Sequence, residues 1–369
     1  MPTSPDVLSV RALNRATLHR QHLIQRSDAM PLDLIQHLVG LQAQMPNPPY
    51  VGLWARLEHF HKADLTCLIE ERKVVRAALM RSTLHLVTAQ DYLELKPLIQ
   101  PVLERQYRGS YGKQLNGLDP AEVAAAAREI LRQQPLNNQD LGLKLQEVWP
   151  DHDPHALAQA ARNFEGLIHV PPAGTWGHHK SALLSPGEVY LGEAVASRPD
   201  LGQLILRYLG AFGPATLKDI SVWSGLTSLK PALQERQGVL RTFRDELGRE
   251  LFDLADAALP DPDLPISPRF LPEFDNLLLS HFDRSRVMDA AAKEKVFTRN
   301  GIIRSAVLID GFVQGLWKVE EGQKGNVLRV QMFQPFSKQD RDMLVQEGLK
   351  LLDFVAEEGT ENQVQFSGF

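Results

Sequence analysis

The chain has 369 residues, of which 43% are hydrophobic and 23% are charged, a composition typical of a globular protein with two or three domains. Its single cysteine, Cys67, excludes an internal disulfide framework and a zinc site built from several cysteines, and it favours a reducing, cytoplasmic location. No apolar run is long enough to span a bilayer, and the first residues carry no signal-peptide core. We therefore expect no membrane anchor and no secretion.

Charge is distributed unevenly along the chain. The formal net charge of −5 argues against a protein that binds nucleic acid over its whole surface. Residues 1–113 nevertheless hold 14 Lys and Arg against 10 Asp and Glu, whereas the remaining residues hold 26 basic against 35 acidic side chains. This asymmetry is consistent with a polyanionic partner that binds the N-terminal third.

Residues 1–113 combine several short helices with a pair of strands. Apolar periodicity, proline starts and capping residues predict helices at residues 7–25, 31–41, 53–60, 64–72 and 89–106. Two β-rich runs, 74–80 and 83–87, flank a polar tip at Arg81 and predict a hairpin. Short helices closed by a two-stranded hairpin are typical of a winged helix.

The same order of elements recurs twice. In residues 114–187, helices are predicted at 121–133, 138–148 and 153–164, and strands at 166–170 and 182–184. In residues 188–255, helices are predicted at 200–212, 217–224 and 226–235, and strands at 239–243 and 250–254. We therefore predict a second and a third winged-helix unit in these ranges. Identity between the units is low, so only the architecture repeats.

The C-terminal part is predicted to be rich in strands. Residues 256–268 contain four prolines and predict a linker. Beyond it, strand-length runs and a closing helix lie at residues 269–279, 302–310, 312–319, 326–333 and 337–356. We predict a small β-barrel over residues 269–369, and an α+β class for the whole chain. Residues 318–325 read as a hairpin tip whose paired glutamates argue against contact with phosphate.

Gln42 and Gln44 lie where a predicted helix meets a proline-rich break. On a helix, residues i and i+2 point apart, but on an extended segment they point to the same side. The prolines that follow favour an extended exit. A glutamine amide carries a donor and an acceptor without charge, so two aimed amides can orient a water and stabilise positive charge. The alternative is that both glutamines belong to a solvated helix end.

Four runs of the sequence, taken together, resemble one family. They are residues 40–44, 80–87, 268–278 and 310–317. In combination they resemble the tandem winged-helix DNA glycosylases of the AlkZ and YcaQ type, and the likeness covers nearly the whole chain. The AlkZ-like branch carries a Gln-x-Gln motif where the YcaQ-like branch carries Gln-x-Asp. The run Gln42-Ala43-Gln44 is thus similar to the AlkZ-like branch.

The resemblance implies three winged-helix units and a β-barrel around a DNA channel. It also implies monofunctional excision of alkylated purines, N7-alkylguanine above all, from double-stranded DNA, and some members unhook interstrand crosslinks. An N7-alkylated guanine is cationic, so the base leaves without a general acid. What remains is to stabilise an oxocarbenium-like sugar and to place a water. We expect Gln44 to hold the water and Gln42 to support water or sugar, with no lysine nucleophile and no covalent intermediate.

Basic and polar residues of the first two hairpins are candidates for DNA contact. Thr83 and His85 share a face of a strand, and His85 either shapes the site or lies hydrogen-bonded in the core. The full set is Arg72, Lys73, Arg76, Arg81, Thr83, His85, His178, His179 and Lys180. For the basic residues the alternative is an ordinary solvated surface. Adjacent histidines without a further ligand set predict no metal, and we expect no cofactor.

Two other interpretations stay open. One is a winged-helix DNA-binding regulator without catalysis. A dimeric regulator that binds a palindromic site needs only one winged helix in each protomer, so three units in one chain count against this interpretation. The other is a YcaQ-like enzyme with broader crosslink repair, against which Gln44 in place of Asp counts. We further expect a monomer associated with the nucleoid. Asp275 and Asn276 are expected to tie the C-terminal strands to the winged-helix units.

Overall fold

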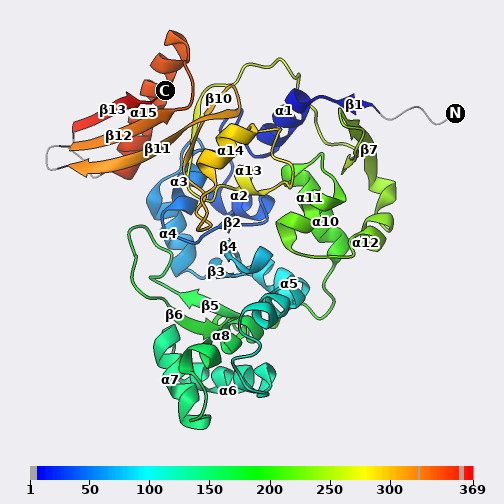
Figure 1. Ribbon diagram of the computed structural model, residues 1–369, viewed down its shortest axis with the longest axis vertical. Coiled ribbons are helices and arrows are strands. Elements are labelled where there is room, and N and C mark those ends of the chain that lie inside the picture. The colour runs from blue at the N-terminus through cyan, green and yellow to red at the C-terminus, as the bar shows by residue number, and fades with distance from the viewer. Residues whose placement is uncertain (1–5, 323–324, 357–360, 369) are drawn as a thin grey trace.

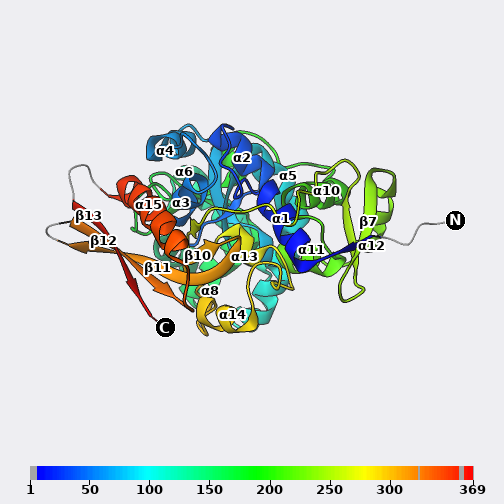
Figure 2. The same ribbon diagram turned by 90° about the horizontal axis from the view of Figure 1, so that it is seen from above.

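The computed structural model describes residues 6–322, 325–356 and 361–368. Its helices and strands form the mixed α+β fold that the sequence predicts. In Figure 1 the C-terminal strands lie at the upper left, residues 201–234 at the right and residues 120–164 at the bottom. Figure 2 shows the C-terminal sheet and strand β7 (Leu240–Asp245) at opposite ends of the molecule. Within the described residues, no helix combines the length and apolar character needed to cross a membrane.

The first set of helices ends in the predicted hairpin. Its elements are α2 (Pro31–His37), β2 (Leu41–Gln42), α3 (Pro48–Trp54), α4 (Lys62–Glu70), β3 (Val74–Ala78) and β4 (Leu84–Thr88). The helix predicted at residues 53–60 is wrong except for its first two residues, because α3 begins at Pro48 and ends at Trp54. Prolines are tolerated in the first turn, where the backbone N–H groups have no partner within the helix. Strand β2 was not predicted, and it pairs with β4.

The second set follows a long connecting helix, α5 (Ala89–Ser110). It comprises α6 (Pro120–Gln133), α7 (Asn138–Val148), α8 (Pro154–Phe164), β5 (Leu167–Val170) and β6 (Leu183–Pro186). Asp119, Asn137 and Asp153 cap the three helices through their side chains, so local signals confirm these predicted helices. Strand β5 pairs with β3, so the two hairpins form one sheet of order β2-β4-β3-β5-β6.

The third set repeats this order beside the N-terminus. After the short helix α9 (Gly187–Leu191) it comprises α10 (Leu201–Phe212), α11 (Leu217–Ser224), α12 (Lys230–Gln234), β7 (Leu240–Asp245) and β8 (Glu250–Leu254). In the second and third sets, one residue between the first two helices bridges to the hairpin, through the pairs Leu136–Leu184 and Ala215–Phe252. Helix α12 is shorter than the predicted helix at residues 226–235.

The N-terminal helix is also shorter than predicted. Residues 7–25 were expected to be helical, but Val7–Leu8 form strand β1, which pairs in parallel with β7, and α1 spans Val10–Arg20. The Ser9 side chain caps the start of α1 by accepting from the N–H of Ala12. Apolar periodicity overestimated this helix because the pairing of β1 with β7 depends on a strand more than two hundred residues away.

The C-terminal strands form an open sheet, and the predicted barrel is not confirmed. The strands are β9 (Arg269–Leu271), β10 (Ala306–Ile309), β11 (Phe312–Gly322), β12 (Gly325–Met332) and β13 (Glu361–Ser367), in the order β13-β12-β11-β10-β9. Helix α15 (Lys338–Val355) contacts β9 at one edge and β12 and β13 at the other. The helix therefore covers the face of the sheet across which the edge strands β9 and β13 would have to approach each other to close a barrel. Residues 323–324, in the predicted hairpin tip, lie outside the described residues.

Two short helices complete this part of the chain. Residues 269–279 were predicted as one strand, but after β9 the chain turns into α13 (Asn276–Leu279), whose start is capped by the Asp275 side chain. Helix α14 (Ala290–Val296) had no predicted counterpart. Both lie between the C-terminal sheet and the third set of helices (Figure 1).

Buried ion pairs join segments that are distant in the sequence. Arg56 donates to both oxygens of Asp275, at 2.7 and 2.8 Å, and the two side chains are 0% and 1% exposed. Asn276 donates to the carbonyl oxygen of Gly40 at 2.8 Å. These contacts confirm the expectation that Asp275 and Asn276 tie the C-terminal part to the first set of helices. Arg20 and Asp253 form a second buried pair at 2.6 Å.

Replacing Asp275 tests how much the structure depends on this connection. Asp275→Ala should lower the free energy of unfolding by about 3–5 kcal/mol, because it leaves the Arg56 guanidinium buried without its partner. Chemical denaturation followed by circular dichroism measures the change. The control is Glu147→Ala, which removes an exposed pair with Lys144 and should cost less than about 1 kcal/mol. Similar losses for both variants would contradict a special role for the buried pair.

Candidate functional site

A tight turn places the Gln42-Ala43-Gln44 segment. Helix α2 ends at His37, and Val39 and Gly40 then adopt left-handed backbone angles, with φ of 53° and 92°. A Cβ on Gly40 would lie 2.5 Å from Cγ1 of Val87, so only glycine fits here. The helix predicted to continue to Leu41 is therefore wrong at its end, because this turn converts the chain into strand β2.

Gln42 is a buried strand residue. It lies opposite His85 in the antiparallel pair of β2 and β4, and it is only 7% exposed. Its Oε1 accepts a hydrogen bond of 2.6 Å from Nη2 of Arg81. With the carbonyl oxygen held in this way, the amide has a fixed orientation. The solvated helix end that was the alternative for Gln42 does not describe this residue.

Arg76 clamps the backbone that follows Gln42. Its Nε donates to the carbonyl oxygen of Ala43 at 2.7 Å, and its Nη2 donates to that of Gln44 at 2.8 Å. Burial lowers the pKa of Arg76 to about 10, so the guanidinium stays charged at neutral pH. Gln44 itself is half-buried, in a bend after β2, and its side chain makes no hydrogen bond within the described residues. Among the described residues, Gln44 thus combines a backbone held in place by Arg76 with a side-chain amide that has no hydrogen-bond partner.

Arg81 links the glutamine segment to the third set of helices. It lies at the hairpin tip with φ of 56°, and its Nη1 donates to the carbonyl oxygen of Trp223 at 2.5 Å while Nη2 holds Gln42. Burial and the nearby charge of Arg284 lower the pKa of Arg81 to about 10. In the structure the guanidinium is therefore occupied by protein acceptors.

His85 is a neutral imidazole beside Gln42. It is 3% exposed, and its Nδ1 lies 2.9 Å from the carbonyl oxygen of Thr83, so Nδ1 carries the proton and donates. Burial, followed by the charge of Arg81, lowers the pKa of His85 to about 3. The Nε2 lone pair remains available as an acceptor. Thr83 turns its own hydroxyl to the carbonyl oxygen of Met80, at 3.0 Å.

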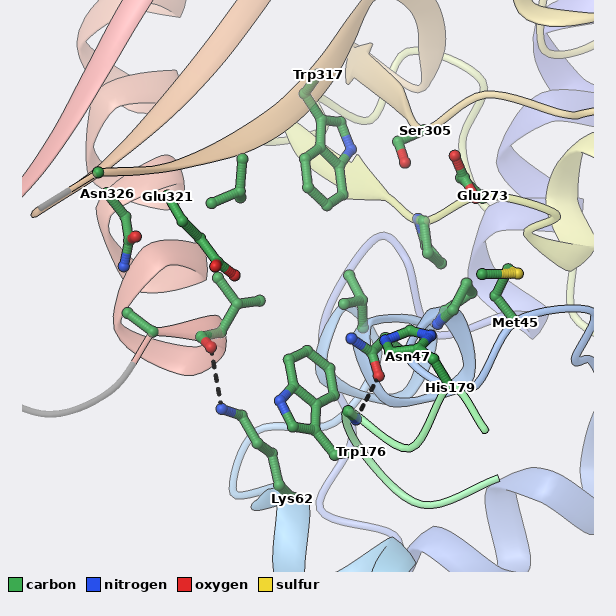
Figure 3. A pocket seen from close by; sticks show the side chains of 18 residues that line it. Met45, Asn47, Lys62, Trp176, His179, Glu273, Ser305, Trp317, Glu321 and Asn326 are labelled. Atoms are coloured by element: carbon green, nitrogen blue, oxygen red, sulfur yellow. Dashed lines mark hydrogen bonds between the residues drawn. The ribbon is translucent and has the colours of Figure 1, made fainter. Parts of the chain in front are cut away.

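A cleft of about 890 Å³ begins next to the glutamine segment (Figure 3). One side is formed by Met45 and Asn47, one and three residues after Gln44, together with the loop that carries Trp176 and His179. The other side is formed by the C-terminal sheet. The Oδ1 atom of Asn47 accepts from the N–H of Gly177 at 2.8 Å, which fixes the loop against the glutamine segment.

Comparison with known proteins identifies the family. A family model described as "DNA glycosylase AlkZ-like" matches residues 35–354. The chain belongs to the AlkZ-like family of DNA glycosylases. The match confirms the resemblance and shows an enzyme that acts on DNA, so the regulator without catalysis loses its support.

Two comparisons with individual proteins, one of sequence and one of structure, agree with the family. An interstrand DNA cross-link repair glycosylase of Streptomyces sahachiroi is 25% identical over 326 residues, which cover 82% of this chain and 85% of the relative. The solved structure of the Streptomyces sahachiroi DNA glycosylase AlkZ has a TM-score of 0.79 at 20% identity, over 98% of this chain and 100% of that one. The folds are therefore similar over almost their full length.

The remaining candidate residues of this AlkZ-like glycosylase lie at the surface. Arg72 donates to the carbonyl oxygen of Tyr190 at 3.1 Å and stacks on its ring, and Lys73 pairs with Glu71 at 2.8 Å. His178 is half-buried, and His179 and Lys180 are exposed in the loop beside the glutamine segment. Among the described residues, no three His, Cys, Asp or Glu side chains gather as a metal site would require.

Sequence reasoning missed three residues that line the cleft. Trp317 and Glu273 lie within runs that carry the family resemblance. The sequence therefore marked these positions, but it did not indicate what their side chains do. Trp176 had no such signal. Its place in the cleft follows from the loop between β5 and β6, whose path is set by tertiary contacts such as the bond from Gly177 to Asn47.

Replacing Arg81 separates a positioning role from contact with phosphate. Arg81→Ala should lower the single-turnover rate of base release about 10- to 100-fold, because Gln42 loses a charge-assisted hydrogen bond. Its affinity for undamaged duplex, measured by fluorescence anisotropy, should change less than threefold. A large loss of affinity at an unchanged rate would instead support contact between Arg81 and DNA phosphate.

Buried neutral histidines predict loss of stability in acid. The pKa values of His85, His169 and His281 are lowered to about 3, and that of His22 to about 4, with burial as the largest cause. The unfolded chain binds protons near pH 6.5 and the folded one does not. Stability is therefore complete above that pH and falls below it, by up to about 1.4 kcal/mol per pH unit for each histidine.

Equilibrium unfolding between pH 7 and pH 4 measures this dependence. His85→Gln should flatten the fall of stability with acid, because one group that must stay neutral in the folded state is removed. The matched control is His59→Gln, since the His59 side chain is 83% exposed. If stability fell with acid as steeply in the His85 variant as in the wild type, the pKa of this imidazole would have to be the same in the folded and unfolded states.

Proposed function

We propose that this glycosylase excises N7-alkylated, cationic purines from double-stranded DNA by attack of a water that the amides of Gln42 and Gln44 position. The observation that carries the proposal is the different state of the two amides. Gln42 is fixed by Arg81, whereas Gln44 has a clamped backbone and an amide that makes no hydrogen bond to any residue that the structure describes. A preorganised support and a free amide suit a residue that steadies the sugar and one that holds water.

The chemistry needs little more than these neutral groups. A purine alkylated at N7 carries positive charge and departs without protonation, so a strong general acid is unnecessary. The carbonyl oxygen of Gln44 can accept a hydrogen bond from the attacking water, while Arg81 keeps Gln42 from turning away. The proton that the water loses on attack passes to the solvent. Hydrolysis by water leaves no covalent link between protein and DNA, which is the monofunctional reaction.

The repeated order of elements supports three winged-helix units. We assign them to residues 1–113, 114–187 and 188–255, followed by the linker 256–268 and the C-terminal unit 269–369. In each unit a hairpin follows short helices, and the first two hairpins share one sheet. This arrangement would present residues 72–85 and 176–180 to one DNA duplex, with Arg72, Lys73, His178 and Lys180 as surface contacts to phosphate.

Crosslinked DNA is a further substrate that we propose. The Streptomyces relative is named for interstrand cross-link repair, and the cleft beside the glutamine segment offers room for more than a methyl group. Gln44 stands where the YcaQ-like branch carries aspartate, so the reaction should depend on an amide and not on a carboxylate.

Release of 7-methylguanine from methylated duplex DNA tests the proposal. The wild type should release the base, and Gln44→Ala should lower the rate about 100- to 1000-fold, as expected for a lost preorganised polar group. Binding to DNA should persist. The control is Gln106→Ala, which removes an exposed glutamine of α5 whose amide donates to the Ser110 hydroxyl at 3.3 Å.

Other outcomes would contradict parts of the proposal. A Gln44→Ala rate near that of the wild type would remove the glutamine mechanism. A protein–DNA adduct trapped by borohydride would show a lysine or amine nucleophile in place of water. If the wild type released neither 7-methylguanine nor a larger N7-adduct, excision of N7-alkylpurines would be wrong.

A further inference from the structure

One wall of the cleft is a single face of β11. Trp317, Val319 and Glu321 alternate along this strand and line the cleft, as residues i, i+2 and i+4 of a strand do. Lys318 and Glu320 belong to the other face, where they pair at 2.6 Å, and Glu320 also pairs with Arg329 at 2.8 Å. Within the described residues of this hairpin, Lys318 and Arg329 thus share the Glu320 carboxylate outside the cleft.

Two indole rings hold fixed positions on opposite walls (Figure 3). Nε1 of Trp317 donates to the carbonyl oxygen of Leu271 at 2.8 Å, and its ring meets Phe270 edge to face at 6.1 Å. Trp176 is held by Tyr50 and Phe354, with ring centroids 5.5 and 5.9 Å away. Rings that are already ordered lose little entropy when a flat group stacks on them.

The cleft also carries acidic side chains. Glu273 is half-buried, and desolvation raises the pKa of its carboxyl group. Neither Glu273 nor Glu321 makes a hydrogen bond or an ion pair within the described residues. Two side chains that can carry positive charge, Lys62 and His179, also line the cleft. Lys62 donates to the carbonyl oxygen of Val355 at 3.2 Å and lies over the Trp176 ring at 4.5 Å. Carboxylates repel phosphate, so this wall is unsuited to the DNA backbone.

A substituent on a damaged purine could reach this cleft directly. Met45 and Asn47 line it, and Met45 is the next residue after Gln44. The volume of about 890 Å³ far exceeds a methyl group and lies within the range of sites for drug-sized ligands. Aromatic faces and carboxylates together are the groups that recognise organic cations.

We propose that this cleft is a subsite for the N7 substituent of the damaged purine, and that it selects a flat aromatic substituent carrying a protonated nitrogen. The inference rests on the proposed excision of N7-alkylpurines and names the class of adduct. Trp317 and Trp176 provide the stacking surfaces. Glu273 and Glu321 provide the negative charge that a protonated nitrogen requires.

Three modified duplexes test the subsite. One contains 7-methylguanine, and the other two contain N7-guanine adducts of monofunctional aryl nitrogen mustards with the same ring, one ending in an ammonium group and one in a carboxylate. The wild type should release the ammonium adduct at least fivefold faster than the carboxylate adduct at limiting enzyme. Glu273→Gln and Glu321→Gln should each lower this ratio at least threefold, because each removes a negative charge and keeps the shape of the side chain.

Neighbouring residues of β11 provide a matched control. Glu320→Gln removes the same charge from the opposite face of the strand and should leave the ratio of the two aryl adducts as in the wild type. Trp317→Ala should slow the release of both aryl adducts relative to 7-methylguanine. Thermal unfolding verifies that each variant is folded, and the ratios cancel any general loss of activity.

The outcomes separate the subsite from the proposed function. If the wild type released 7-methylguanine but treated both aryl adducts alike, and Glu273→Gln changed nothing, the subsite would be wrong and the excision reaction would stand. A preference that Glu320→Gln abolished as strongly as Glu321→Gln would place the effect outside the cleft and also overturn the subsite. Failure to release any of the three bases would overturn the excision reaction itself.

Discussion

The pairing of β2 with β4 is the constraint on which the candidate site depends. It requires the left-handed turn at Gly40, because any Cβ there would collide with Val87 on β4. Once β2 is paired, Gln42 lies opposite His85, and the chain leaves the strand after Gln42 and passes through Gln44 to the cleft. A helix running on to residue 44 would have put the two glutamines on different sides. The geometry of the motif is thus a consequence of sheet pairing.

Two arginines, Arg76 buried and Arg81 half-buried, then hold the glutamine segment that the strand pairing has placed. Arg76 and Arg81 come from the hairpin that carries β4, and both direct their guanidinium groups at the glutamine segment. The excess of basic residues in the N-terminal third therefore has two uses. Some of these basic side chains lie at the surface, as Arg72 does. Others donate hydrogen bonds to backbone carbonyl oxygens inside the protein. Net charge alone could not distinguish these uses, since both kinds of arginine count equally in the sequence.

The cleft beside the glutamine segment has a surface that is more aromatic and more acidic than that segment. Its walls combine aromatic rings, half-buried carboxylate and the amide of Asn326, and they are drawn from segments that begin at residue 45 and end near residue 356. In a family that acts on DNA, a region that repels phosphate must serve something other than the backbone. The proposed reaction centre at Gln42 and Gln44 and the proposed adduct subsite in the cleft are therefore adjacent but built from separate groups.

The sequence by itself determined the features that depend on local contacts. Helices α6, α7 and α8 were predicted almost to the residue because their caps lie within three positions of the first turn, and the hairpin of β3 and β4 follows from its own alternation and tip. The family was also identified from the runs that contain Gln42, Gln44 and Trp317. Only the tertiary structure decided the pairing of β1 with β7, the open C-terminal sheet beneath α15 and the occupation of Arg76 and Arg81. The two sheet features depend on strands and helices far away in the chain. For the two arginines, the sequence does not say whether the guanidinium donates to water or to protein carbonyl oxygens. Local propensity contains neither kind of information.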